Sequence, residues 1–296
     1  MMINDKSAAS FEEVRVRVFD GVEIYGRHYP ARGSTRRPLV CLAGLTRNSR
    51  DFHDLACALS GDGADARPVY TIDTRGRGQS EFVDDWHQYA VPVEMLDVQD
   101  FMAAQHLHGA AVLGTSRGGL IAMVMAAAQP SLIGAVILND IGPVIERDGL
   151  MRISGFVGKA PLPVSWETAA RRIGDAEKNY FPDISEDEWV AIARQRFNEK
   201  NGKPAPGYDP AIGRTFAAIS DGPVPQLWRQ YLALRHAPCL VIRGVLSDLL
   251  SAATADQMAE RHPNCQLHAV PRQGHAPTLN DAPTRTAIQE FLASAD

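Results

Sequence analysis

The chain has 296 residues, a length that suits one large domain or two domains of about 150 residues each. Hydrophobic residues make up 45% of the chain and charged residues 22%, so it has ample apolar surface for a core, which excludes an intrinsically disordered protein. Its 30 Lys and Arg against 35 Asp and Glu give a net charge of −5. This balance offers no general attraction to nucleic acid or anionic lipid, and we expect neither as a partner.

Cysteine usage and apolar runs indicate the compartment. The four cysteines are scattered without a C-x-x-C pair, which favours reduced thiols over disulfides or a zinc site; they are Cys41, Cys57, Cys239 and Cys265. The N-terminal stretch 1–7 has no apolar core of a signal peptide, and no run approaches the roughly 18 apolar residues of a membrane span. We therefore expect a cytoplasmic protein without a membrane association.

The first half of the chain alternates short apolar runs with longer segments of helical periodicity. An antiparallel hairpin is predicted over 11–20 and 22–29, turning at Asp20-Gly21. The strands and helices that follow alternate; strands are predicted at 38–44, 67–73, 110–115 and 133–138, and helices at 50–60, 91–108 and 117–128. Strands joined through helices form a parallel sheet, and strands without strict polar alternation are buried on both faces.

The alternation stops between about residues 142 and 237. Proline-broken helical patterns fill this stretch, at 166–172, 185–200 and 225–234. The earlier pattern then returns, with strands predicted at 238–244 and 266–270 and helices at 253–261 and 282–293. The simplest organisation is one α/β core, 11–142 plus 238–296, interrupted by a helical insertion at 143–237.

The most specific motif is Gly114-Thr115-Ser116-Arg117-Gly118, which lies where a predicted strand meets a helix. A G-x-S-x-G at such a junction is typical of a nucleophile elbow, in which a serine projects from a sharp turn and small neighbours let strand and helix approach closely. The helix N-terminus adds positive potential beside the serine oxygen. We therefore predict Ser116 as a nucleophile rather than a residue of a tightly packed helix start.

A serine nucleophile needs a neighbouring base, and nine histidines are available. His275 follows the last predicted strand in Gly274-His275-Ala276-Pro277, and the loop after that strand can reach the sheet edge where the elbow opens. The other eight histidines lie at helix ends or in no motif. We predict His275 as the base.

A carboxylate must orient that base and stabilise its cationic form. Asp248 follows the predicted strand 238–244 at the same sheet edge, and Asp140 follows the strand 133–138. We favour Asp248 as the acid and keep Asp140 as the alternative, with a role in lining the pocket or holding the start of the insertion if Asp248 is the acid.

Stabilising an oxyanion requires two fixed backbone N–H donors. One should come from Arg117, the residue after the nucleophile, and the other from the loop after the strand 38–44, where Leu45 is the expected donor.

These motifs resemble those of the α/β-hydrolase superfamily, in the branch of Ser-His-Asp hydrolases with an inserted cap. Besides the order serine, acid, histidine, the segment Asp73-Thr-Arg75-Gly-Arg-Gly-Gln-Ser80 resembles the family's D-x-R-G-x-G-x-S turn, where we expect Arg75 to tie down the loop. One departure is Ala43 before Gly44, where relatives usually have histidine. The resemblance implies an α/β-hydrolase fold: a mainly parallel eight-stranded sheet flanked by helices, with a helical cap inserted after the sixth strand.

The resemblance also implies a reaction without metal or organic cofactor on a small-molecule substrate, in a monomer or homodimer. We expect a hydrolase of a carboxylic ester or lactone, acting through an acyl-enzyme. A carbon–carbon hydrolase of a vinylogous diketone is the alternative, although relatives of that kind often carry a bulky aromatic after the histidine, where this chain has Ala276. A catalytically inactive binder of small molecules is the third class.

Substrate selectivity is expected in the insertion. Four cap aromatics are candidates for an apolar pocket, with packing inside the cap as the alternative role for each; they are Trp166, Phe181, Trp189 and Trp228. The side chain of Arg117 stands next to the nucleophile, where it would pair either with a substrate carboxylate or with a nearby acid such as Asp140.

Overall fold

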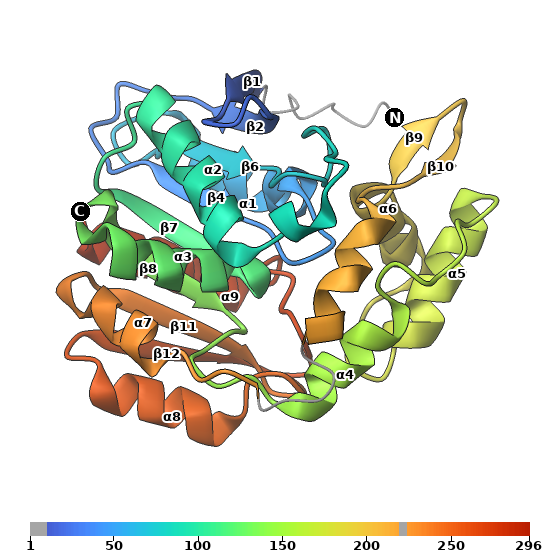
Figure 1. Cartoon of the computed structure of the whole chain (residues 1–296). Helices are drawn as coiled ribbons and strands as arrows, with labels where there is room; N and C mark the ends of the chain where they lie inside the picture. The colour runs from blue at the N-terminus through green and yellow to red at the C-terminus, as the bar shows by residue number, and fades with distance from the viewer. Residues whose placement is uncertain (1–10, 219–223) are drawn as a thin grey trace, which may run out of the picture.

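One eight-stranded sheet forms the centre of the protein (Figure 1). The structure is a computed structural model that describes residues 11–218 and 224–296. The N-terminal stretch 1–7, which was considered as a signal peptide, lies outside the described residues. The strands follow the order β1 (Glu12–Arg17), β2 (Glu23–Tyr29), β6 (Val69–Ile72), β4 (Leu39–Leu42), β7 (Ala110–Thr115), β8 (Ile133–Asn139), β11 (Cys239–Gly244) and β12 (Cys265–Val270). The pair β1–β2 and the pair β2–β6 are antiparallel, and the remaining pairs are parallel. The predicted fold class is confirmed.

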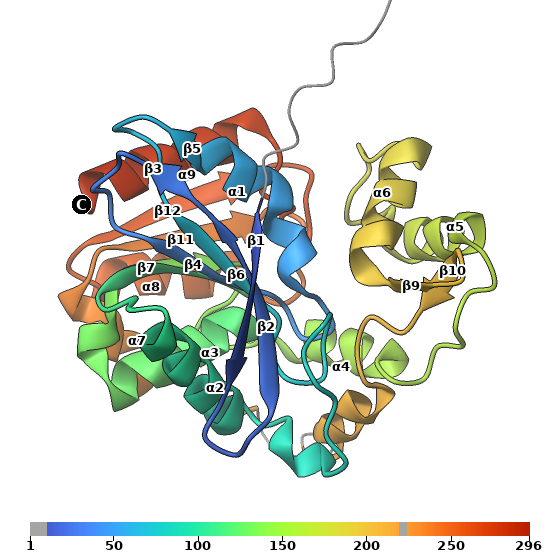
Figure 2. The same cartoon turned by 90° about the horizontal axis from the view of Figure 1, so that it is seen from above.

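Helices cover both faces of the sheet (Figure 2). On one face lie α1 (His53–Leu59) and α9 (Ala282–Ser294), and on the other lie α2 (Val91–Ala104), α3 (Arg117–Ala128), α7 (Trp228–Leu232) and α8 (Ala252–Arg261). Alternate strand residues contribute to the two hydrophobic layers: Val112 faces one cluster and Leu113 the other. Because both faces are buried, β4 is apolar at every position, as its sequence indicated.

The sheet edge that matters for function is formed by the carboxyl ends of β7, β8 and β11. Thr115 of β7 is in register with Asn139 of β8, and Asn139 is in register with Ile242 of β11. The residues that directly follow these positions, Ser116 and Asp140, therefore emerge side by side.

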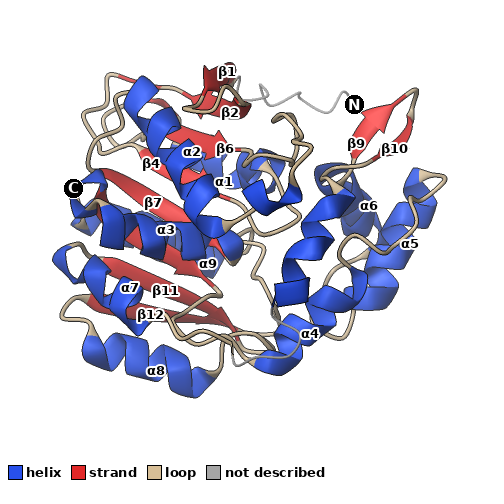
Figure 3. Ribbon diagram, in the orientation of Figure 1, coloured by secondary structure: helices blue, strands red, loops and turns tan. Residues whose placement is uncertain are grey.

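The cap lies beyond this edge (Figures 1 and 3). It contains α4 (Arg147–Phe156), α5 (Trp166–Glu177), α6 (Glu186–Arg196), a hairpin of β9 (Asn198–Lys200) and β10 (Lys203–Ala205), and the 3-10 segment Pro210–Ala218. The helix predicted to reach residue 200 ends at Arg196, because Asn201 and Gly202 both adopt positive φ (53° and 73°) and close a tight β turn.

The C-terminal part of the predicted insertion belongs to the core layer. Helix α7 and the turn Ala233–His236 that follows it pack against α3, and Tyr231 is fully buried in the same cluster as the sheet. The two ends of the remaining insertion meet, because the N–H of Leu227 donates to the carbonyl of Pro143 at 2.7 Å. Within the described residues, none of the helices combines the length and apolarity that crossing a bilayer requires.

Candidate active site

Ser116 occupies the sharp turn between β7 and α3. Its backbone has φ 52° and ψ −113°, a conformation that L-residues rarely adopt outside strained functional turns. A Cβ at Gly114 would collide with the backbone of Gly118 and Gly119, and a Cβ at Gly118 would collide with the carbonyl of Leu42. The glycines of the motif are therefore required for the close approach of strand and helix that exposes the serine.

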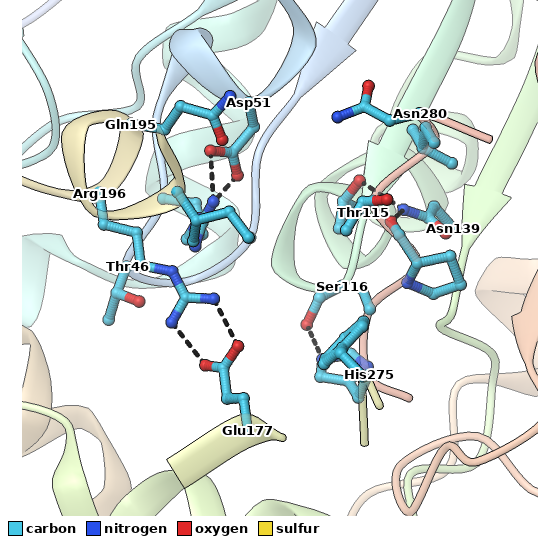
Figure 4. Close-up of a pocket in the computed structure, with 18 of the residues that line it drawn as sticks. Thr46, Asp51, Thr115, Ser116, Asn139, Glu177, Gln195, Arg196, His275 and Asn280 are labelled. Carbon is cyan, nitrogen blue, oxygen red and sulfur yellow. Dashed lines mark hydrogen bonds and ion pairs between the residues drawn. The ribbon is translucent and has the colours of Figure 1, made fainter. Parts of the chain in front are cut away.

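His275 joins Ser116 to a buried carboxylate. Its Nε2 lies 2.9 Å from Ser116 Oγ (Figure 4), and its Nδ1 lies 2.8 Å from Oδ2 of Asp140. An ionised carboxylate only accepts hydrogen bonds, so Nδ1 carries the proton and Nε2 is free to accept one from the serine. The arrangement is that of a nucleophile, a base and an orienting acid.

The acid in contact with the histidine is Asp140, which corrects the preference for Asp248. Asp140 has φ 54°, and its side chain is completely buried. Oδ1 accepts from the N–H of Gly244 at 2.9 Å, and Oδ2 accepts from the hydroxyl of Ser247 at 2.5 Å as well as from His275. The oxygens of Asp140 are thus held by the last residue of β11 and by the loop that follows it, the loop in which Asp248 itself lies.

Asp248 binds the cap instead. Its two oxygens accept from Arg152 of α4 at 2.6 and 2.8 Å. Burial raises the pKa of Asp248, but the hydrogen bonds and the positive charge of Arg152, with smaller contributions from other groups, together bring the pKa below its ordinary value. Asp248 is therefore an ionised partner in a salt bridge between cap and core.

The loop after β4 lies against the nucleophile, where the oxyanion donors were expected. A Cβ on Gly44 would stand 3.7 Å from Cβ of Ser116, and Leu45 lines the cavity above the serine. Arg117 begins α3, and the N–H groups of a helix's first turn have no acceptor within the helix. The backbone positions of Leu45 and Arg117 are thus compatible with the predicted oxyanion hole.

The side chain of Arg117 turns away from the catalytic groups. Its Nε donates to Oε2 of Glu94 at 2.7 Å and its Nη2 donates to the carbonyl of Tyr89 at 2.7 Å. Its acidic partner is therefore Glu94 rather than Asp140. The guanidinium is hydrogen-bonded to protein groups and is not directed toward a substrate carboxylate.

A cavity of about 430 Å³ opens above Ser116 and His275. The core contributes loop residues such as Leu45 and Pro277, and the cap contributes apolar side chains from α4, α6 and the connection before α6. Phe181 and Trp189 line the cavity, as expected. The other two cap aromatics predicted for the pocket, Trp166 and Trp228, are not among the residues that line this cavity.

Trp166 and Trp228 have structural roles. Trp166 lies in the cap's own hydrophobic cluster, and its indole N–H donates to the carbonyl of Gly202 at 3.1 Å. Trp228 lies on α7 in the core layer, with the guanidinium of Arg261 stacked 4.1 Å from its ring centroid. Trp166 thus has the alternative role expected for it, packing inside the cap, whereas Trp228 packs against the core instead.

Two bidentate ion pairs line the same cavity. Nε and Nη2 of Arg47 each donate to Asp51 at 2.7 Å. Nη1 and Nη2 of Arg196 donate to Glu177 at 2.5 and 2.6 Å. Figure 4 shows Asp51 and the Arg196–Glu177 pair on the other side of the cavity from Ser116. Burial raises the pKa of Glu177, but the charge and hydrogen bonds of Arg196, together with the charges of Arg47 and Arg152, hold the pKa below its usual value. This wall is polar and its charges are balanced.

Sequence reasoning missed several residues that shape the site. Ser247 and Arg152 lie in no motif, and nothing in the sequence marks them. Glu94 could have been noticed in the sequence, because this carboxylate adjoins Met95 on the apolar side of the helix predicted at 91–108. In the structure Glu94 is completely buried. An acid at such a position requires buried cationic partners.

Comparison with known proteins agrees with this architecture. Residues 39–289 match the profile of the Alpha/beta hydrolase family, and the chain belongs to that family. A 3-hydroxybutyrate-oligomer hydrolase from Cupriavidus necator is 34% identical over 276 residues, covering 88% of this chain and 89% of its own. The crystal structure of an α/β hydrolase from Novosphingobium aromaticivorans is 36% identical, covers 96% of this chain and 99% of its own, and superposes with a TM-score of 0.89.

A more distant structure shares the fold. The crystal structure of E-2-(acetamidomethylene)succinate hydrolase is 22% identical, covers 96% of this chain and all of its own (100%), and has a TM-score of 0.79. The family match and the two relatives of 34% and 36% identity identify the chain as a hydrolase.

Proposed function

We propose that this hydrolase cleaves carboxylic esters through an acyl-enzyme on Ser116. The observation that carries the proposal is the continuous hydrogen-bond chain from Ser116 Oγ through His275 to the buried Asp140, with 2.9 and 2.8 Å between the heavy atoms. A serine becomes a competent nucleophile when a base removes its proton, and a base becomes competent when its tautomer is fixed.

The reaction then runs in two halves. Ser116 Oγ attacks the ester carbon while His275 Nε2 takes the hydroxyl proton, and the carbonyl oxygen becomes an oxyanion held by the N–H groups of Leu45 and Arg117. Nε2 returns the proton to the departing alkoxide, and an alcohol leaves. Water attacks the acyl-enzyme by the same route and releases the carboxylic acid, which restores Ser116.

For the substrate, we propose short esters of hydroxy acids, of the kind cleaved by a 3-hydroxybutyrate-oligomer hydrolase. The relative of that name is 34% identical over 88% of this chain. The cavity supports the same class, because it is small, about 430 Å³, and combines apolar side chains such as Ile153 with the ion pairs of Arg47 and Arg196. Such a wall suits an ester-rich, polar chain better than a long alkyl chain.

Labelling with a fluorophosphonate probe tests the catalytic proposal. The wild-type protein should be labelled on the peptide containing Ser116, and Ser116→Ala should not be labelled. Absence of wild-type labelling, with no ester turned over, would overturn the proposal in favour of a binding protein of the same fold.

A substrate panel tests the proposed class. It contains a 3-hydroxybutyrate trimer, p-nitrophenyl butyrate, p-nitrophenyl palmitate, a γ-lactone and a ring-cleavage dienone. We expect turnover of the trimer and the butyrate, with kcat/KM for the palmitate at least about tenfold lower because the cavity is short. Turnover of the dienone alone would make the chain a carbon–carbon hydrolase.

A further inference from the structure

A single buried carboxylate connects the two segments of the proposed oxyanion hole. Glu94 on α2 is completely buried and lies between two guanidinium groups. Its Oε1 accepts from Nη1 of Arg77 at 2.6 Å, and its Oε2 accepts from Nε of Arg117 at 2.7 Å. No charged group of this triplet belongs to the catalytic triad.

Each arginine acts on one of the two donor segments. Nε of Arg77 donates to the carbonyl oxygen of Leu45 at 2.9 Å and so holds the loop that carries the first proposed donor. Arg117 is itself the residue after the nucleophile, and its side chain is held by Glu94 and by the carbonyl of Tyr89. Glu94 therefore lies between two arginines, each of which is attached to one of the two donor segments.

The charges keep this connection intact at neutral pH. Burial raises the pKa of Glu94, but the positive charges of Arg117 and Arg77 outweigh it, so the pKa lies below its ordinary value and the group stays ionised. Hydrogen bonds between a carboxylate and a guanidinium are shorter and more directional than neutral ones, so they hold atoms in place more firmly.

A second buried ion pair on the same helix offers a comparison. Asp97, three residues further along α2, accepts from Arg75 at 2.7 and 2.5 Å. Arg75 also donates to Asp20 and Gln88, as expected of a residue that ties down its turn. The carbonyl of Arg75 accepts from Nη1 of Arg77 at 2.7 Å, but the side-chain hydrogen bonds of Arg75 and Asp97 reach neither Leu45 nor Arg117.

We propose that Glu94 is a positioning residue for the oxyanion hole: through Arg77 and Arg117 it holds the N–H groups of Leu45 and Arg117 at the spacing that the tetrahedral oxyanion requires. The proposal rests on the serine-hydrolase function proposed above. Donors held in advance stabilise the transition state selectively, whereas a small displacement costs turnover without weakening substrate binding.

The first test compares Glu94→Gln with Asp97→Asn, using p-nitrophenyl butyrate. We expect Glu94→Gln to lower kcat by about 10- to 100-fold with KM within about twofold of wild type, since misplacing a catalytic group by roughly 1 Å costs on this scale. Asp97→Asn should lower the melting temperature with kcat within about twofold. Affinity for n-butylboronic acid, which forms a tetrahedral adduct, should fall in parallel with kcat for Glu94→Gln only.

If Glu94→Gln does not fold, Arg117→Met removes the same contact from the more accessible side, where the arginine side chain is 15% exposed. It should reduce kcat by about tenfold, again without a change in KM. When both variants fold, their double variant should lose no more kcat than the worse single variant, because the two side chains act through one contact.

The outcomes separate the two proposals. Wild-type protein that is not labelled by the fluorophosphonate probe refutes the serine-hydrolase function and the role of Glu94 with it. Wild-type labelling with an unchanged kcat for Glu94→Gln, or with equal kcat losses for Glu94→Gln and Asp97→Asn, refutes the role of Glu94 alone.

Discussion

Replacing Asp140 by asparagine preserves the shape of the side chain and exchanges one oxygen for an NH₂ group. If the NH₂ takes the place of Oδ2, it faces Nδ1 of His275 and the hydroxyl of Ser247, both of which now donate to that oxygen. If the NH₂ takes the place of Oδ1, it faces the N–H of Gly244, and because both groups are donors the hydrogen bond to Gly244 is lost. The first orientation makes Nδ1 an acceptor, so the proton moves to Nε2 and His275 loses its capacity to deprotonate Ser116.

The expected effect is a fall in kcat of about 10⁴-fold, which corresponds to about 5 kcal/mol of transition-state stabilisation. The matched control is Asp248→Asn. It weakens a salt bridge whose side chains are 22% and 29% exposed and should cost at most about 1 kcal/mol of stability, with kcat within about twofold of wild type.

The assay is initial-rate hydrolysis of p-nitrophenyl butyrate by both variants, with the melting temperature of each followed by circular dichroism. An active Asp140→Asn beside an inactive, folded Asp248→Asn would refute the geometric assignment of the acid.

Three further predictions concern the elbow, the cap and the cavity. Gly118→Ala should destabilise the protein by about 3 kcal/mol in denaturant titration, because the new Cβ meets the Leu42 carbonyl; an unchanged midpoint would contradict this. Glu177→Gln should lower the melting temperature at pH 7. Because the pKa of Glu177 is lowered in the folded state, its pairing with Arg196 stabilises the protein fully above about pH 4.5 and is lost as the pH falls through the folded pKa. The difference in melting temperature between wild type and variant should therefore shrink below about pH 4.5. A difference that stays constant with pH would exclude the ion pair as its cause. Phe156→Ala should raise KM for p-nitrophenyl butyrate about fivefold at unchanged kcat, because the half-exposed ring lines the cavity; an unaltered KM would show that the bound ester does not reach it.

The positions of Ser116 and His275 were predictable because each residue stands in a short local motif. Gly114 and Gly118 are required by contacts within one strand–turn–helix unit, and such local constraints leave a motif. His275 likewise lies in the loop that follows the last strand, β12. Local sequence therefore predicted the elbow and the histidine loop at their observed places.

The choice between two acids was not predictable, because both follow strands that end at the same edge. The decision depends on the positive φ of Asp140 and on the donors Gly244 and Ser247, which belong to a different part of the chain. The pairing of Asp248 with Arg152 of the cap could not be predicted from the sequence either, because the two residues lie far apart in the chain. Helical periodicity raises a similar difficulty for Trp228, because it predicts which face is buried but not the layer against which that face packs.

The hydrogen bond between Pro143 and Leu227 brings the two ends of the cap segment together at one stem. A segment that leaves and re-enters a scaffold at one point adds little loop-closure entropy when its length changes. Whole cap segments should therefore be exchangeable between relatives at this stem, and a transplanted segment would have to supply partners for the core residues Asp248 and Arg50. If the proposed function holds, such an exchange would change the cap side of the cavity and leave Ser116, His275 and Asp140 in place.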